Sequence, residues 1–267
     1  MVGPQPAGTY LNLDVVFPGV QAQVEHRIPI YGVANELWLK ANTLLALPFL
    51  ESQADVDLRL VVISIGGSIG YRNNFQTLGF LPGESISRLH RLDKQTAGDY
   101  RDTQAGYGEF RATLALPFND NALLLSLNGL RYEGGPDRAF DWRAGVVRDS
   151  GTIFKSDTTL FFKHPKLGAA GPMFELIDYP IDGIRRTQLN YGFTVVTRPG
   201  FRRANDILFF AMLFNFGDTL GGYNAGNTYG SHIFYGAFTF QLAYRAVFEL
   251  KGPTPLTHDH DLEDVKL

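Results

Sequence analysis

The sequence predicts an all-β protein: a single transmembrane, antiparallel, up-and-down β-barrel of about twelve strands. Three observations lead to this prediction. Segment after segment alternates apolar and polar residues with period two, which is the repeat of a strand. The connections carry turn residues and show no helical crossovers. The last apolar run, residues 232–250, is much longer than the usual strand of about 5–6 residues.

The last run has two faces of opposite character. Its apolar face consists of alternate residues: Phe234, Gly236, Phe238, Phe240, Leu242, Tyr244, Ala246 and Phe248. The interleaved face carries Thr239, Gln241 and Arg245. A membrane-spanning strand needs about 9–11 tilted residues with such an apolar face. The run therefore predicts a strand that crosses a membrane.

The same alternation recurs along the chain, at residues 11–17, 20–30, 37–47, 58–71, 110–116, 123–127, 140–146, 154–162 and 189–195. Residues 173–179 are a weaker candidate strand, and residues 207–216 are nearly all apolar. The run 58–71 changes phase at Ile63, which predicts a β-bulge beside Gly66 and Gly67. Pro18-Gly19, Asn119-Asp120 and Pro199-Gly200 are typical of tight turns. We expect an N-terminal extension (1–8), a barrel (9–250) with a long loop (73–106), and a polar C-terminal tail (251–267).

Composition narrows the class of protein. Among 267 residues, 45% are hydrophobic and 19% charged, so disorder is excluded for most of the chain. Cysteine is absent, which excludes disulfides and a thiol nucleophile. A net charge of −3 gives no indication of nucleic-acid binding. The start, MVGPQPAGTY, lacks the features of a signal peptide, and we expect the numbering to be that of a mature chain.

The polar face mixes acidic and basic residues in most runs. The residues expected to line a lumen are Glu25, Arg27, Glu36, Lys40, Glu109, Arg111, Asp141, Arg143, Lys155, Asp157 and Arg245. A soluble β-sandwich also alternates, but its polar faces meet bulk water. Mixed charges that pair across a narrow lumen favour the barrel. Aromatic residues near predicted strand ends, among them Phe49, Tyr132 and Tyr179, indicate an interfacial girdle.

The most specific segment is Gly236-Ala-Phe238-Thr-Phe240-Gln-Leu242-Ala-Tyr244-Arg-Ala-Val-Phe248. It resembles the C-terminal assembly signal of Gram-negative outer-membrane β-barrel proteins, and the resemblance covers residues 9–250. The resemblance implies location in the bacterial outer membrane, contact with its lipid and lipopolysaccharide, and recognition by the barrel-insertion machinery. The polar tail after Phe248 departs from the family pattern. Residues 188–200 also resemble barrels of predatory or gliding δ-proteobacteria.

The segment 73–106 is too long for a hairpin turn. Within it, Ile86, Leu89 and Leu92 have the spacing of a short amphipathic helix, and Arg88 and Arg91 lie between them. It could plug the lumen, dock another envelope protein, or cover the rim. Counting hairpins backwards from a periplasmic C-terminus places it on the periplasmic side, where turns are usually short. Either a weak strand such as 173–179 is miscounted, or the loop faces the periplasm.

No residue pattern indicates catalysis, a metal or a cofactor. His26 lies on an apolar face, which favours an interfacial residue over a general base. The sequence His258-Asp259-His260-Asp261 is more typical of a solvated tail than of a metal site. We expect that the protein is not an enzyme but a porin-like passive channel for small polar solutes. The alternative is a structural or docking component of an envelope-spanning motility or secretion machine. A lipid-modifying enzyme is the least favoured. The solute, the partner and the oligomeric state stay open.

Overall fold

The computed structural model describes residues 7–16, 19–30, 35–46, 49–75, 103–135, 139–141, 146–164, 168–181, 183–197, 207–215 and 238–251. All regular secondary structure in these ranges is β-strand. No helix in the described part is long and apolar enough to cross a membrane.

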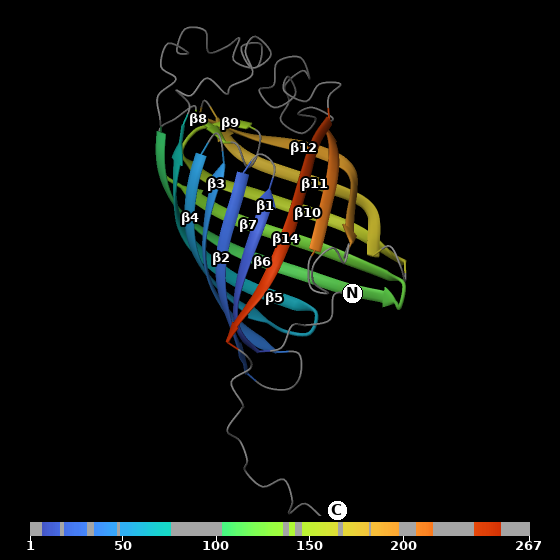
Figure 1. The fold of residues 1–267 in the computed structure, drawn as a ribbon. Helices are drawn as coiled ribbons and strands as arrows, with labels where there is room; N and C mark the ends of the chain where they lie inside the picture. The colour runs from blue at the N-terminus through green and yellow to red at the C-terminus, as the bar shows by residue number, and fades with distance from the viewer. Residues whose placement is uncertain are drawn as a thin grey trace, which may run out of the picture.

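The strands are β1 (Gly8–Val16), β2 (Gly19–Pro29), β3 (Glu36–Ala46), β4 (Phe49–Arg59), β5 (Ile63–Asn74), β6 (Thr103–Asn119), β7 (Ala122–Glu133), β8 (Ala139–Asp141), β9 (Val146–Arg148), β10 (Gly151–His164), β11 (Gly168–Ile181), β12 (Ile184–Thr197), β13 (Ile207–Asn215) and β14 (Phe238–Lys251). Twelve of them close into a barrel in which neighbours in the chain are neighbours in the sheet (Figure 1). Every pairing is antiparallel, and β1 closes the ring against β14. The predicted fold class is confirmed.

The two edges of the barrel differ in their connections. At the edge where β1 begins and β14 ends, Thr9 pairs with Lys251. At the opposite edge, Val16 pairs with Gly19, and the segments 75–102, 134–150 and 216–237 connect the strands. Outer-membrane barrels carry long loops outside and short turns in the periplasm. The edge with the termini is therefore the periplasmic edge, and the other is the extracellular edge.

Two errors in the predicted strand count cancel. The run 58–71 is not one bulged strand, because β4 and β5 form a regular hairpin with Arg59 opposite Ser64. The run 140–146 is not a wall strand, because β7 pairs directly with β10 and the run falls within the β8–β9 hairpin. Strands of three residues are too short to span a bilayer. Removing the run 140–146 from the wall also reverses the parity of the count made backwards from the C-terminus, so β5 ends and β6 begins at the extracellular edge.

The barrel is apolar outside and polar inside. Val15, Val56 and Phe174 are each more than half exposed on the outer face, whereas Glu25 and Arg72 are 1% and 0% exposed. A soluble domain distributes these residue types the opposite way. Closure leaves no unpaired strand edge, which is the condition for a β-structure to stand in lipid. This distribution excludes the soluble sandwich.

The predicted aromatic girdle is only partly right. Tyr132 and Phe110 are more than half exposed on the outer face, as a lipid-facing aromatic requires. Phe49 and Tyr179 are buried instead, at 6% and 1% exposure. Position near a strand end does not decide which face a side chain takes, because the phase of the alternation decides it.

Candidate functional site in the barrel lumen

Cross-strand register arranges the lumenal polar side chains in rows. Asn12 lies opposite Gln23, Gln23 opposite Asn42, and Asn42 opposite Gln53. These four side-chain amides, which we call the amide row, run across β1 to β4. Because residues in register on one face lie next to each other, the row is continuous. It is a band of neutral hydrogen-bonding groups.

A charged group lies next to the amide row, towards the periplasm. Arg111 of β6 reaches back to β4, with Nη1 2.5 Å from Asp55 Oδ1 and Nη2 3.1 Å from Asp57 Oδ1. Lys40 of β3 pairs with Asp57 from the other side. Asn42 and Gln53 of the amide row donate to Asp55. These contacts tie β3, β4 and β6 together and leave each charge with a partner.

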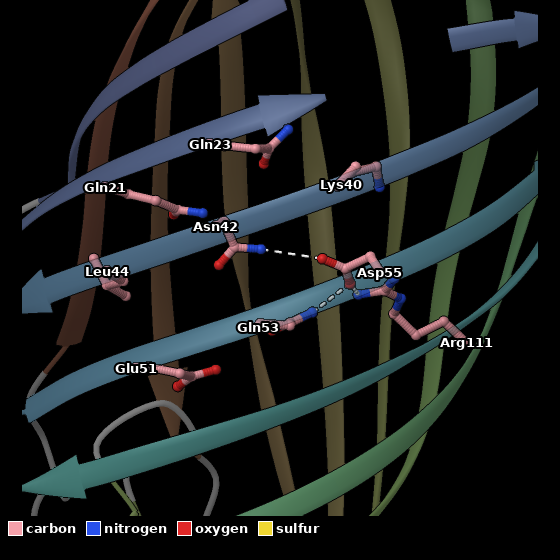
Figure 2. Close-up of a pocket in the computed structure, with 9 residues that line it drawn as sticks. All are labelled: Gln21, Gln23, Lys40, Asn42, Leu44, Glu51, Gln53, Asp55 and Arg111. Atoms are coloured by element: carbon pink, nitrogen blue, oxygen red, sulfur yellow. Dashed lines mark hydrogen bonds and ion pairs between the residues drawn. The ribbon is translucent and has the colours of Figure 1, made fainter. Parts of the chain in front are cut away.

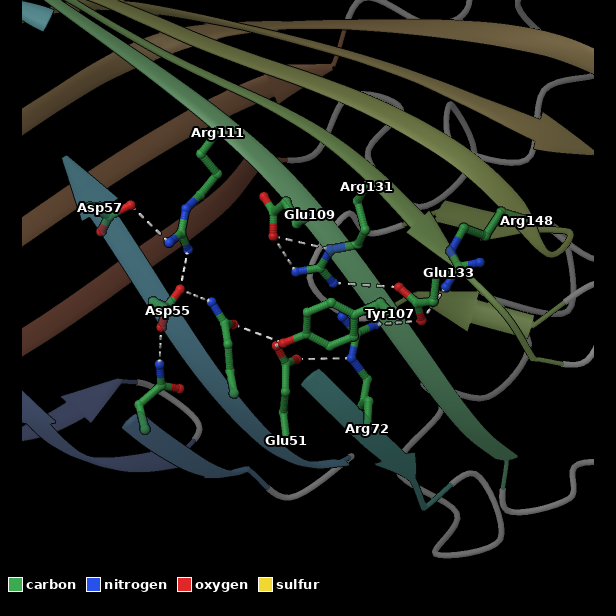
Figure 3. A network of polar contacts seen from close by, with 12 residues as sticks. Glu51, Asp55, Asp57, Arg72, Tyr107, Glu109, Arg111, Arg131, Glu133 and Arg148 are labelled. Carbon is green, nitrogen blue, oxygen red and sulfur yellow. Dashed lines mark hydrogen bonds and ion pairs between the residues drawn. The ribbon is translucent and has the colours of Figure 1, made fainter. Parts of the chain in front are cut away.

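A second network lies towards the extracellular edge (Figure 3). Arg72 of β5 donates from Nε to Glu51 Oε2 at 2.9 Å, and its Nη1 lies 3.6 Å from Glu133 Oε1. Arg131 Nη1 lies 3.4 Å from Glu133, and Arg148 of β9 pairs with the same carboxylate. Glu133 thereby joins the rim hairpin β8–β9 to the wall. We call the two networks together the ionic wall. It consists of Asp55, Asp57 and Arg111 from the first network, and of Glu51, Arg72, Tyr107, Glu109, Arg131 and Glu133 from the second.

Tyr107 holds the two networks together. Its hydroxyl lies 2.5 Å from Glu51 Oε1 and 2.8 Å from Gln53 Oε1, and the Arg131 guanidinium lies 3.9 Å from its ring centre. The ring occupies the space above Gly70, where an added Cβ would be 2.2 Å from Tyr107 Cζ. Only glycine leaves this space, which is why β5 carries one here.

The periplasmic end of the lumen holds a stack of cations on an aromatic ring. The guanidinium of Arg27 lies 3.8 Å and that of Arg59 3.2 Å from the Trp38 ring centre. The indole Nε1 donates to Glu36 at 2.6 Å, and Arg27 pairs with Glu25. Cations over a ring face are attracted by its quadrupole, so the stack fills this end with ordered side chains.

Two further pairs hold other parts of the ring. Arg245 of β14 donates to both oxygens of Asp14 on β1, at 2.8 and 2.7 Å, across the closing seam. Lys155 Nζ lies 2.6 Å from Glu175 and 3.3 Å from Asp157. A bidentate Arg–carboxylate pair fixes geometry as well as charge, so the seam pair supports closure of the barrel.

One part of the lumenal surface of β11 and β13 is apolar. Met173, Ala211 and Leu213 are buried together, with Phe209 packed against them. Their register places them side by side, because Gly192 of β12 faces both Met173 and Leu213. We call this cluster the apolar wall. It offers no charge and no hydrogen-bonding side chain to a solute.

A cavity of about 190 Å³ opens beside the amide row (Figure 2). It is lined by Gln21, Gln23, Lys40, Asn42, Leu44, Glu51, Gln53, Asp55 and Arg111. Eight of these nine side chains carry polar groups, and all come from β2, β3, β4 and β6. It is the candidate functional site.

The structure distributes the sequence-predicted residues unevenly. Lys40 and Arg111 reach the cavity. Glu109 pairs with Arg131 at 3.0 Å. The contacts described above include the other predicted residues on the wall strands: Glu25, Arg27, Glu36, Lys155, Asp157 and Arg245. Asp141 lies on β8, in the rim hairpin and outside the wall strands, and its place in the lumenal lining stays a prediction. Arg143 and the loop residues Ile86, Arg88, Leu89, Arg91 and Leu92 lie outside the described residues.

Sequence reasoning missed most of the acidic half of the site. Glu51, Asp55 and Asp57 lie on β4, which was not predicted as a strand. The period-two spacing of these acids was the available signal, since it places them on one face. Across the described residues, no group of histidine, cysteine or acidic side chains is arranged to hold a metal ion.

Comparison with known proteins finds only weak similarities of structure. Neither a protein-family model nor a curated protein sequence matches this chain. Among solved structures, it is similar to the KdgM porin, at 9% identity and a TM-score of 0.35, over 90% of this chain and 95% of that one. It is also similar to LpxR from Salmonella typhimurium, at 10% identity and a TM-score of 0.37, over 90% and 99%. Values this low bear on neither activity nor site residues.

The class of the protein follows from the barrel itself. A closed, even-stranded, antiparallel barrel with a lipid-compatible outer face and a polar interior is the architecture of a bacterial outer-membrane β-barrel protein.

Proposed function

We propose that this protein is a passive channel for small polar solutes across the bacterial outer membrane. The observation that carries the proposal is the cavity beside the amide row, whose lining is almost entirely polar. A lumen filled only for stability would be expected to bury apolar side chains or fully interlocked charges. Amide side chains around a cavity offer both donors and acceptors to a passing solute.

Charge pairing defines what kind of channel this is. Strong ion selectivity comes from rings of charge of one sign. Here Arg111 pairs with Asp55 and Lys40 with Asp57, so the lining is mixed and locally balanced. The proposal therefore predicts weak selectivity between potassium and chloride.

The proposal retains the partners expected from the sequence: outer-membrane lipid and lipopolysaccharide on the outer face, and the insertion machinery during assembly. It assigns no catalytic residue. The docking role of the segment 73–106 stays a prediction, because residues 76–102 lie outside the described part.

Single-channel recording in a planar bilayer tests the proposal. The purified barrel should conduct potassium chloride, and Asn42→Trp, which places a large ring at the cavity, should lower the conductance at least about twofold. Leu45→Trp on the outer face of the same strand is the matched control, since Leu45 is 52% exposed. Absence of conductance in the unchanged protein, or an equal effect of the two substitutions, would contradict the proposal.

A further inference from the structure

The amide row is a neutral polar band of the lumenal face, and it borders the cavity. Four neutral amides follow one another in register on β1 to β4: Asn12, Gln23, Asn42 and Gln53. Adjacent strands lie about 4.8 Å apart, so the row offers donor and acceptor groups at a regular spacing. A ligand in the cavity meets the row amides of Gln23, Asn42 and Gln53 on three neighbouring strands.

Every charged group that lines the cavity has a partner of opposite charge. Lys40 pairs with Asp57, Arg111 with Asp55, and Glu51 with Arg72. A charged ligand would have to compete with these pairs, and separating a buried pair is costly. The cavity therefore disfavours both anions and cations.

Hydrogen-bonding capacity is nevertheless left over. Within the described part, the Gln21 amide makes no hydrogen bond, and Asn42 uses only its Nδ2 group, which donates to Asp55. Asn12 is 2% exposed, and its Oδ1 has no hydrogen-bond partner there. Buried polar atoms without a partner are uncommon in folded proteins and call for one. These groups include both acceptors and donors.

From these observations we propose that the amide row binds a neutral, polyhydroxylated solute, that is, an uncharged sugar or short oligosaccharide. Each hydroxyl group donates one hydrogen bond and accepts others, which matches side-chain amides. A peptide backbone fits less well, because its donors and acceptors are separate groups and its termini are charged. The inference deepens the proposed channel function and rests on it for its biological purpose.

Equilibrium binding tests the inference separately from conduction. Isothermal titration calorimetry of the detergent-solubilised barrel should show binding of maltotriose, and about tenfold weaker binding or none for an acidic trisaccharide of the same length and for triglycine. Asn42→Leu should weaken maltotriose binding about tenfold, the loss expected for one well-formed hydrogen bond.

Gln188→Leu is the matched control, because Gln188 is a buried lumenal amide on β12, away from the row. It should leave maltotriose binding within about twofold. No heat of binding with maltotriose, tighter binding of the acidic sugar or the peptide, or equal effects of Asn42→Leu and Gln188→Leu would each overturn the inference. Binding without conductance would overturn only the channel function, and conductance without binding only the sugar specificity.

Discussion

The ionic wall and the apolar wall face the same lumen but are stabilised by different interactions, namely ion pairs and apolar packing. In the ionic wall, the buried charge of Arg72 forms ion pairs with Glu51 and Glu133, and the three residues lie on three strands. In the apolar wall, Met173, Ala211 and Leu213 exclude water without any directed contact. The cavity lies beside the ionic wall. Charged side chains that are fixed by ion pairs leave a cavity with a polar lining between them, whereas apolar side chains pack closely and leave little space.

The two walls also differ in how a substitution destabilises them. Removing one member of a buried ion network leaves an unpaired charge, while trimming an apolar side chain leaves a void. The following substitutions compare these costs, from the largest expected effect to the smallest.

Arg72→Leu should be the most damaging single change. It removes the ion pair with Glu51 and one cation from Glu133, in a region where Arg72 and Glu133 are both 0% exposed. The expected loss is about 3–5 kcal/mol of unfolding free energy. Urea unfolding from lipid vesicles, followed by tryptophan fluorescence, measures it. A loss below about 1 kcal/mol would show that the ionic wall contributes little to stability.

Leu213→Ala should cost less, and in a different way. Leu213 is 4% exposed in the apolar wall, and truncation removes packing against Met173 and its neighbours. A loss of about 2–4 kcal/mol is expected from the same unfolding measurement. Conductance should stay near that of the unchanged protein, because the cavity lies on other strands. A larger loss than for Arg72→Leu would reverse the comparison between the walls.

Gly70→Ala should produce the smallest of these losses, about 1–3 kcal/mol, because the new Cβ displaces the Tyr107 ring. Displacing the ring disturbs the hydroxyl contacts to Glu51 and Gln53. Gly106→Ala is the matched control on β6, since an added Cβ there meets nothing within 4 Å. Equal stability of the two variants would mean that the close approach of Tyr107 does not matter.

The fold was predictable because each wall strand alternates apolar residues, which face lipid, with polar residues, which face the lumen. Long outer faces such as that of β14 repeat apolar residues without interruption, and this pattern survives errors in individual strands. The strand β4 escaped prediction because its outer face includes Ser52 and Ala54, which weaken the apolar signal. The run 140–146 was wrongly predicted as a wall strand because its apolar and polar residues alternate strongly. A short hairpin at the rim can alternate as regularly as a strand that spans the membrane.

The site was less predictable, because its contacts depend on register. Pairs two residues apart on one strand, such as Glu25 with Arg27, can be read from the sequence. The contact of Arg111 with Asp55 spans 56 positions of sequence and requires knowing that β4, β5 and β6 are adjacent. The amide row has the same dependence, since a shift of one residue in any strand would move its amide to the lipid face.

The central claim is that the polar face lines a lumen and the apolar face meets lipid. Spin labels placed one at a time along β2, from residue 20 to residue 26, test it most directly in lipid vesicles. The label at Val24, which is 45% exposed, should collide mainly with oxygen, and the label at Gln23, which lines the cavity, mainly with a water-soluble nickel complex. The account predicts that the two accessibilities alternate with period two and in opposite phase. If Val24 and Gln23 were equally accessible to the nickel complex, the membrane-spanning barrel would be contradicted.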